Sequence, residues 1–298
     1  MIPKLLPPIK VHCWGGFGSQ LYAIVILNRL KRRFPFRRVI VIFHDGGVTQ
    51  RKLDVALLLR ENEFRQIFDF SAATSIRKPV RHFVNQSFLR RNIIDCFKLI
   101  LLKIGFVGKC DTQTGVEKLR PWVLEIRGHY TKLVISNFDF ASLIQRFPSS
   151  ILAEFNVHQN NPIPGLHFRL GDLLSLTEKE PISSERVRQA ILMLKMLVDL
   201  NSIQLFSDSL PVALSILNNF DFDFDLKVLS SDTSIFFAFI YLVRSSAFIA
   251  TPSKVSEWVV LFRYFLGING QTLIPKELVS HFKEIAPEIL NASQVYVY

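Results

Sequence analysis

Extended apolar runs alternate with helical ones through most of this 298-residue chain. The first cycle has an extended run at residues 9–14, a glycine-rich turn at 15–18, a helix that ends near Leu30 and a β-branched run at 38–43. A continuous β-branched run is typical of a parallel strand that is buried on both faces. Because β-α-β order places helices on the faces of a parallel sheet, the sequence predicts an α/β fold.

The alternation restarts after a Pro- and Asn-rich stretch at residues 160–164. Extended runs at 165–169, 203–206, 226–229 and 247–251 are separated by helical segments, and helices at 256–265 and 275–290 close the chain. A short Pro-rich stretch between two such patterns is typical of an interdomain hinge. We therefore expect two α/β domains, residues 1–161 and residues 162–298.

The composition excludes a disordered or fibrous protein, because 49% of the residues are apolar and the mean hydropathy is +0.26. Three cysteines with irregular spacing predict neither a disulfide framework nor a zinc site, so a reducing compartment fits best. No uncharged apolar run approaches the roughly 18 residues of a membrane-spanning helix. We expect a cytoplasmic protein.

The net charge of +11 favours an anionic partner. Basic residues gather in a helical stretch between Arg77 and Lys103. This stretch is either a solvated face or a cationic surface for anionic lipid headgroups or for a pyrophosphate-linked acceptor. No nucleic-acid-binding motif accompanies the charge, so we do not expect nucleic acid as a partner.

Residues 167–172 read His-Phe-Arg-Leu-Gly-Asp and follow directly on an extended run. In an open α/β sheet, ligands bind at the carboxyl ends of the strands. The planar fork of Arg169 suits a pyrophosphate, because it stays charged and donates two parallel hydrogen bonds. The structural alternative is a buried, hydrogen-bonded His167 beside an ordinary ion pair of Arg169 with Asp172.

Two later segments also follow extended runs. Asp208, within Ser-Asp-Ser at 207–209, is placed to bind ribose hydroxyls or the N–H edge of a purine. Ser253 and Ser256, within residues 250–258, are placed to hold phosphate oxygens at a helix N-terminus. Both segments are equally good helix caps, and capping is compatible with binding.

The turn at residues 15–18 reads Gly-Gly-Phe-Gly and opens a helix. It is either a phosphate- or sugar-binding turn or only a tight βα connection. The third glycine of a dinucleotide fingerprint is missing, which argues against an oxidoreductase. No metal-ligand spacing is present apart from alternating aspartates at 221–225 in a Phe-rich loop, so we expect no metal.

Taken in order, these segments resemble the motifs of GDP-fucose-dependent fucosyltransferases. The resemblance is greatest to the bacterial α1,2-fucosyltransferase family and more distant to the α1,6- and protein O-fucosyltransferases. Residues 15–20, 167–172, 206–209 and 251–258 match Gly-Gly-Leu-Gly-Asn-Gln, His-x-Arg-Arg-Gly-Asp, Phe-Ser-Asp-Asp and Ser-Asn-Ser-x-Phe-Ser-Trp-Trp. Ser19, Leu170, Ser209 and Glu257 stand where the family has Asn, Arg, Asp and Trp.

The resemblance implies a GT-B glycosyltransferase fold with two Rossmann-like domains that face a cleft. Residues 1–161 would then form the acceptor-side domain, and residues 162–298 would bind the GDP-sugar donor. It implies inverting transfer of fucose from GDP-fucose to a glycan hydroxyl, with no metal and no cofactor. A surface-polysaccharide or O-antigen acceptor carried on a lipid, at the inner face of a bacterial inner membrane, would fit the cationic stretch.

The resemblance also assigns roles to single residues. Arg169 would neutralise the β-phosphate, His167 would lie along the nucleotide, and Asp208 would hold the guanine or the ribose. Asp172 is the nearest acidic candidate for a general base, so Arg169, Asp172 and His167 form the predicted catalytic set. The predicted donor-binding residues are Gly16, Gly18, Ser19, Gln20, His167, Arg169, Ser207, Asp208, Ser253, Val255 and Ser256.

Two alternatives remain open. The first is a glycosyltransferase of the same fold that uses another nucleotide sugar, which the replacement at Ser19 allows, because the family's Asn lies near the reacting sugar. The second is a glycan- or lipid-binding relative that has lost catalytic turnover.

Overall fold

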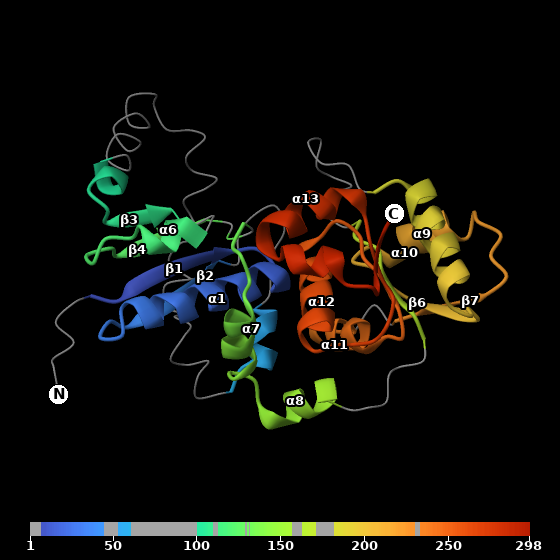
Figure 1. The fold of residues 1–298 in the computed structure, drawn as a ribbon, viewed down its shortest axis with the longest axis horizontal. Helices are drawn as coiled ribbons and strands as arrows, with labels where there is room; N and C mark the ends of the chain where they lie inside the picture. Colours follow the sequence, from blue (N-terminus) through green and yellow to red (C-terminus); the bar gives the residue numbers. More distant parts are fainter. Residues whose placement is uncertain are drawn as a thin grey trace. The chain divides into compact units, whose positions relative to one another are not determined.

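The computed structural model describes residues 7–44, 53–60, 100–109, 113–128, 130, 132–156, 163–170, 182–229 and 233–298. The chain divides into two compact units, an N-terminal unit Met1–Pro148 and a C-terminal unit Ser149–Tyr298 (Figure 1). Each unit contains one parallel sheet with helices packed on it. The predicted α/β class, with two Rossmann-like halves, is therefore confirmed.

The N-terminal unit is built on a parallel sheet of strand order β2-β1-β4-β3. Its described elements are β1 (Ile9–Trp14), α1 (Phe17–Arg33), β2 (Val39–His44), the 3-10 helix η1 (Asp54–Leu58), β3 (Val107–Lys109), α6 (Gln113–Glu117), β4 (Glu125–Arg127) and α7 (Asn137–Ile144). β1 and β2 pair along their full length, from Ile9 opposite Val39 to Trp14 opposite His44. The carboxyl ends of these two strands therefore lie side by side.

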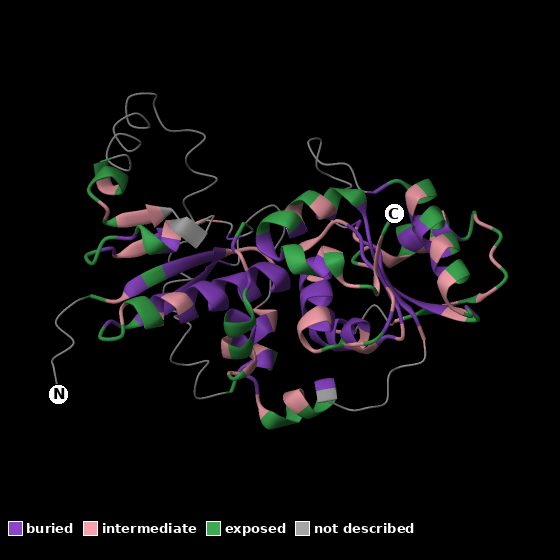
Figure 2. Cartoon of the chain, viewed as in Figure 1, coloured by how far each residue is buried: buried purple, intermediate pink, exposed green. Residues whose placement is uncertain are grey.

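Helix α1 forms the core of this unit. Its residues are buried almost continuously from Phe17 to Leu30, because β1, β2 and α7 all pack against it. Figure 2 shows the helix and the two strands beside it as mostly buried. The turn between β1 and α1 needs a glycine at position 15, where φ is +118° and a Cβ would come within 2.7 Å of Ser19 Oγ.

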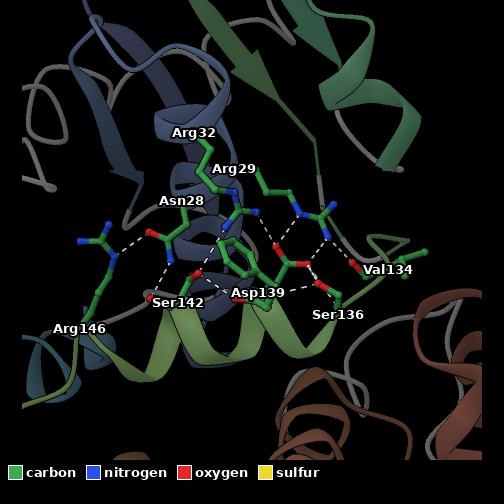
Figure 3. A network of polar contacts seen from close by, with 9 residues as sticks. Asn28, Arg29, Arg32, Val134, Ser136, Asp139, Ser142 and Arg146 are labelled. Atoms are coloured by element: carbon green, nitrogen blue, oxygen red, sulfur yellow. Dashed lines mark hydrogen bonds and ion pairs between the residues drawn. The ribbon is translucent and has the colours of Figure 1, made fainter.

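A buried carboxylate joins α7 to α1 (Figure 3). Asp139 accepts from Arg29 and Arg32 of α1, at 2.7 and 2.9 Å. Its side chain also forms a reciprocal capping box with Ser136 at the start of α7. Burial alone would raise the pKa of Asp139, but the hydrogen bonds from Arg29 and Ser136 and the arginine charges lower it to about 2. The carboxylate therefore stays charged at neutral pH and fixes α7 on α1.

The C-terminal unit has a six-stranded parallel sheet of order β10-β9-β8-β5-β6-β7. Its described elements are α8 (Ser149–Asn156), β5 (Gly165–His167), α9 (Ser184–Leu197), β6 (Ser202–Phe206), α10 (Leu210–Leu217), β7 (Asp225–Val228), α11 (Ile235–Arg244), β8 (Phe248–Ile249), α12 (Lys254–Phe265), β9 (Thr272–Ile274), α13 (Lys276–Ile285), the 3-10 helix η4 (Pro287–Asn291) and β10 (Val295–Val297). The sheet grows outward from β5 through β6 to β7, and the chain then returns to the other side of β5 with β8. This is the strand order of dinucleotide-binding folds, in which ligands bind outside the carboxyl ends of the two central strands.

Helices cover both faces of this sheet. Leu166 of β5 packs into an apolar cluster with α9 and α10. Gly165 lies on the opposite face, where a Cβ would come within 2.8 Å of Leu242 of α11. Because side chains alternate along a strand, His167 lies on the same face as Gly165. The strand thus presents His167 on the face that carries α11 and α12.

The boundary between the two units lies at a different position from the predicted one. The predicted boundary followed residue 161, whereas the contacts divide the chain between Pro148 and Ser149. The reason is α8, which packs against α11 and inserts Phe155 beside Phe239 and Phe262, with ring centroids 6.4 and 5.4 Å apart. The stretch 157–162, which contains part of the predicted hinge, lies outside the described residues.

Within the described ranges, the helices are too short or too polar to cross a membrane.

Candidate functional site

Thr251 links the carboxyl ends of β5 and β8, the two strands at the centre of the C-terminal sheet. Its hydroxyl donates to the backbone oxygen of His167 at 2.7 Å and accepts from the backbone N–H of Arg169 at 3.0 Å. The strands themselves pair only from Gly165 opposite Phe248 to Leu166 opposite Ile249. The Thr251 side chain therefore continues the connection beyond the last strand residues and fixes the backbone at His167 and Arg169.

His167 is buried and faces the first turn of α12. Its Nδ1 lies 2.7 Å from Ser256 Oγ and 3.3 Å from Ser253 Oγ. Ser256 Oγ accepts from the Thr251 N–H at 3.3 Å, so its own hydrogen is available to His167 Nδ1. This arrangement favours the tautomer of His167 with its hydrogen on Nε2.

Burial lowers the pKa of the His167 imidazole well below its usual value. The charge of Asp208 acts in the opposite direction, and that of Arg169 adds to the lowering. The ring also stacks on Phe206, with centroids 5.5 Å apart. His167 is therefore neutral at pH 7 and serves as a hydrogen-bonding group rather than as a cation.

Arg169 brings a positive charge to the site. Its guanidinium forms an ion pair with Asp208, whose second oxygen accepts from the Leu170 N–H at 2.9 Å. The Arg169 and Asp208 side chains keep 21% and 26% of their surface exposed, so a ligand can reach both. Asp208 thus holds the chain segment after β5 at two points and orients the guanidinium.

The N-terminus of α12 adds further hydrogen-bond donors next to His167. Ser253 is the N-cap residue and accepts from the Ser256 N–H at 3.0 Å. The amide groups of a helix N-terminus carry partial positive charge and favour an anion nearby. Arg169 and α12 both follow the central strands, so this sheet edge has the charge and the donors that suit an anionic group.

The structure brings together the predicted residues His167, Arg169, Asp208, Ser253 and Ser256. Ser207 accepts from the Ser209 N–H at 3.1 Å, directly before α10, and Val255 lies in the first turn of α12. Gly171 and Asp172 lie outside the described residues, so the predicted ion pair and the predicted base at Asp172 stay predictions.

The remaining predicted residues belong to the start of α1 in the N-terminal unit. Gly16 is the N-cap residue, and its oxygen accepts from the N–H groups of Ser19 and Gln20 at 2.9 and 3.2 Å. The Gln20 amide bridges the backbone of Gly15 and Val55. Gly18 and Ser19 are buried in the first turn of the helix. The local contacts of Gln20 therefore support the turn itself.

The alternating aspartates at 221–225 form no cation site in the part of the chain that is described. Asp223 pairs with Lys195 at 2.5 Å, and Phe222 stacks on Phe224. Among the described residues, no three His, Cys, Asp or Glu side chains are grouped as metal ligands would be. The expectation of a metal-free reaction stays a prediction.

Most of the cationic stretch between Arg77 and Lys103 lies outside the described residues. Lys103 itself is described and is exposed on a helical turn before β3.

Sequence reasoning missed the central part that Thr251 plays in the site. Thr251 is the first residue of the motif at 251–258, and its position gives one signal for this role. A hydroxyl residue directly after a short apolar strand is placed to bond to the neighbouring strand end, where the regular ladder stops.

No family model matches the sequence, and no curated protein does. Among solved structures, the chain is similar to the fucosyltransferase NodZ from Bradyrhizobium, with 14% identity over 86% of this chain and 93% of that one and a TM-score of 0.48. It is also similar to the E. coli ADP-heptose lipopolysaccharide heptosyltransferase II, with 11% identity, coverage of 98% and 90% and a TM-score of 0.43. POFUT1 in complex with GDP gives 11% identity, coverage of 91% and 99% and a TM-score of 0.43. Because these values are low, we base the proposed function on the chain's own residues.

Proposed function

We propose that this protein is a glycosyltransferase of the GT-B type that transfers fucose from GDP-fucose to a hydroxyl of a glycan. The observation that carries this proposal is the position of Arg169, which follows the central strand of a dinucleotide-binding sheet beside the N-terminus of α12. A nucleoside diphosphate combines a double negative charge with a flat base, and this sheet edge suits both.

The chemistry follows from the charge that develops during transfer. As the bond between the fucose and the β-phosphate breaks, the departing GDP takes the electron pair and gains negative charge. A fixed guanidinium and helix N-terminal amides stabilise that charge without reorganisation. Arg169 is held at its backbone by Thr251 and at its guanidinium by Asp208, so it is already oriented for this role.

Three further side chains contribute to donor binding in this proposal. Ser253 and Ser256 present the first turn of α12 to the diphosphate. His167 lies behind them as a neutral group and contributes no repulsion to a cationic sugar. A neutral imidazole also avoids trapping the diphosphate in the ground state, which favours turnover.

The finer features are inferred from the motif resemblance. They comprise an α1,2 linkage to a galactoside, inversion at the anomeric carbon, and a lipid-linked acceptor in surface-polysaccharide or O-antigen synthesis. The N-terminal unit would take the acceptor, with Gly16, Gly18, Ser19 and Gln20 near the sugar. The net charge of +11 supports peripheral contact with an anionic membrane from the cytoplasmic side.

The nucleotide preference tests the proposal. The melting temperature of the purified protein is measured with GDP, UDP, ADP and GDP-fucose at equal concentrations. We expect GDP and GDP-fucose to raise it by about 5 °C at a concentration of about 100 times Kd, and UDP and ADP to leave it unchanged.

Stabilisation by UDP or ADP alone would overturn the GDP-fucose assignment in favour of another nucleotide sugar. Stabilisation by glycans and by none of the nucleotides would identify a binding protein without turnover. Stabilisation by GDP without GDP release from GDP-fucose points to another GDP-sugar, which the Ser19 replacement allows.

A further inference from the structure

Large apolar side chains are exposed at one end of the N-terminal sheet. They lie in the segments directly before β2, β3 and β4, and they are Phe36, Ile100, Leu102, Ile104, Phe106 and Trp122. Because the strands of this sheet are all parallel, the segments that precede them lie at the same edge, which we call the amino edge. Figure 1 shows the first residues of β1 and β3 at the same end of the sheet as the turn between α1 and β2.

The exposure at the amino edge is large for a folded protein. Phe36 is 80% exposed and Trp122 is 47% exposed. Figure 2 shows the turn after α1 and the helical turn before β3 as mostly exposed. Single exposed apolar residues are common, but a group of them on neighbouring segments is typical of a surface that binds a protein or a membrane.

Hydrogen bonds join the segments of the amino edge to one another. The Arg37 guanidinium donates to the backbone oxygens of Pro121 at 2.8 Å and Pro7 at 2.7 Å. The Trp122 indole N–H donates to the backbone oxygen of Ile104 at 2.8 Å. The segments before all four strands therefore form one continuous surface.

The segment before β3 is held in its conformation by a helix-terminating motif. The Gly105 N–H donates to the Leu102 oxygen at 3.1 Å, and the Phe106 N–H donates to the Leu101 oxygen at 3.0 Å. Gly105 has φ of +81°, and a Cβ there would come within 2.7 Å of Arg120 Cγ. Glycine therefore both ends the helical turn and lets it pack against the segment before β4.

Positive charge accompanies the apolar side chains. Arg38, Lys103 and Arg120 are exposed in the same three segments. Within the residues that the structure describes, no carboxylate forms an ion pair with any of the three. Glu125, at the start of β4, pairs with Arg127 at 2.7 Å, so its charge is compensated within its own strand. The amino edge is therefore cationic as well as apolar.

The apolar and the cationic groups are in direct contact at Trp122. The Arg120 guanidinium lies over the indole ring, 5.9 Å from its centroid. Indole rings are favoured at the boundary between the headgroups and the acyl chains of a bilayer. Each lysine or arginine near an anionic membrane strengthens binding about fivefold. Both halves of this surface thus match the same partner.

The charge decides between the possible occupants. A second copy of the chain would bring an equally cationic surface, and the two would repel each other. A bilayer with anionic lipids offers negative headgroups above an apolar interior, which complements both kinds of side chain.

The amino edge lies at the opposite end of the strands from the edge where parallel sheets bind ligands. β1 has six residues, and a strand rises about 3.3 Å per residue, so the two edges are separated by about 20 Å. Contact with a membrane at the amino edge therefore leaves the carboxyl edge of the same sheet accessible.

We propose that the amino edge of the N-terminal sheet is a docking surface for an anionic phospholipid bilayer. Phe36 and Trp122 insert between the headgroups, and Arg38, Lys103 and Arg120 bind the lipid phosphates. The inference rests on the peripheral membrane contact in the proposed function and names the surface that makes it. Docking itself requires neither GDP nor a sugar.

The first experiment measures cosedimentation of the purified whole protein with vesicles, without nucleotide. One set of vesicles is phosphatidylcholine alone, and the other contains about one-third phosphatidylglycerol. We expect binding to the anionic vesicles, little binding to the neutral ones, and a loss of binding as NaCl rises to about 0.5 M. Equal binding to both sets would overturn the role of the charge.

The second experiment reverses two charges at a time. We expect Arg38→Glu with Lys103→Glu to weaken binding to the anionic vesicles at least about 25-fold. The matched control is Lys227→Glu with Lys283→Glu, two exposed lysines of β7 and α13, which changes the net charge equally. Because charges far from the bilayer are screened, we expect the control to lose less than about threefold. Equal losses would show that net charge alone attracts the protein.

The third experiment tests the apolar side chains. We expect Phe36→Ser to weaken binding to the anionic vesicles about 10-fold, because a phenyl ring no longer enters the bilayer. Phe237→Ser, on α11 and 63% exposed, is the matched control and keeps wild-type binding. Wild-type binding by Phe36→Ser would overturn the insertion of this side chain.

Trp122 also reports its own environment. It is the most exposed of the three tryptophans, since Trp258 is fully buried and Trp14 is partly buried. We expect anionic vesicles to shift the tryptophan fluorescence of the wild type to shorter wavelength and to leave that of Trp122→Phe in place. An unshifted wild-type spectrum with bound vesicles would place Trp122 outside the contact and overturn the proposed orientation.

The remaining outcomes identify other occupants or separate the two proposals. A wild type that binds no anionic vesicles overturns the docking surface. In that case, a dimer that dissociates in Phe36→Ser identifies a second copy as the occupant, and binding to soluble polyglutamate identifies an acidic polypeptide. If the wild type binds vesicles but neither GDP nor GDP-fucose, the docking surface holds and the proposed donor fails.

Discussion

Asp208 uses both of its oxygens on the protein, one on the Arg169 guanidinium and one on the Leu170 N–H. Its predicted role, to hold the guanine or the ribose, stays a prediction, and these contacts indicate an additional role. If Arg169 binds the diphosphate as proposed, the Asp208 carboxylate beside it repels the phosphate while it orients the guanidinium. We propose that Asp208 acts as a positioning residue for Arg169.

This role predicts a specific result for Asp208→Asn, which keeps the shape and the acceptor for the Leu170 N–H but loses the charge. We expect kcat for GDP release to fall about 10-fold, because Arg169 is less well oriented. We expect GDP affinity, measured by calorimetry, to stay equal or to increase. A Kd for GDP raised more than about 10-fold would return Asp208 to the nucleotide-binding role.

His167 predicts how stability depends on pH. Its pKa is lowered by burial from 6.5 to about 4, so between these values the unfolded chain binds more protons than the folded one. Stability from this group is complete above about pH 6.5 and is lost as the pH falls toward 4. We expect the free energy of unfolding in urea to decrease over this window in wild type and to change less in His167→Gln.

Two carboxylates with strongly lowered pKa values affect stability in a different pH range from His167. The pKa values of Glu125 and Asp139 are lowered to about 2, from 4.5 and 3.8, so their contribution is lost mainly below this window. Equal pH slopes in wild type and His167→Gln between pH 6.5 and pH 5 would contradict the buried, neutral state of His167.

At the scale of single elements, the first turn of α12 combines capping and binding. Ser253 accepts from the Ser256 N–H and also lies 3.3 Å from His167 Nδ1. We expect Ser253→Ala to lower the free energy of unfolding by about 1 kcal/mol, as the loss of an N-cap does, and to weaken GDP binding as well. Urea unfolding and calorimetry with GDP measure the two effects.

Ser234 is the matched control because it caps α11 in the same way, by accepting from the Phe237 N–H, and follows the edge strand β7. Ser234→Ala is expected to cost similar stability and to leave GDP binding unchanged. Equal GDP affinity in both variants would show that Ser253 is only a cap.

The elements that the sequence predicted are those with long apolar patterns. The predicted strand at 9–14 agrees with β1, and the predicted helix at 256–265 agrees closely with α12. β3, β9 and β10 were not predicted. Each has three residues, and pairing with neighbouring strands rather than local preference makes them extended.

The site residues were predicted from the same apolar patterns, which locate the ends of the strands. Strand ends could be located from the sequence, so His167, Arg169, Asp208 and Ser256 were predicted at one sheet edge. The bonds of Thr251 and the His12–His44 contact could not be predicted, because they join residues 82 and 32 positions apart, and only the strand register brings them together. Long-range pairs of this kind are set by topology.

At the scale of the whole molecule, each unit has its own parallel sheet and its own buried core. The predicted boundary after residue 161 relied on a Pro-rich stretch, whereas the packing of α8 on α11 divides the chain at residue 148. A composition change indicates where the chain turns, but packing decides which unit a helix joins. Division into a donor-binding and an acceptor-binding half stays part of the proposed function.

The initial rate of GDP release from GDP-fucose, for wild type and Arg169→Ala compared at equal folded concentration, tests the account most directly. Removing a group that stabilises charge in the transition state costs about 100-fold or more in rate. We expect a loss of at least that size in Arg169→Ala, and a smaller loss in Arg169→Lys, which keeps the charge without the planar fork. Full activity of Arg169→Ala would contradict the assignment of this sheet edge as the site where the diphosphate leaves.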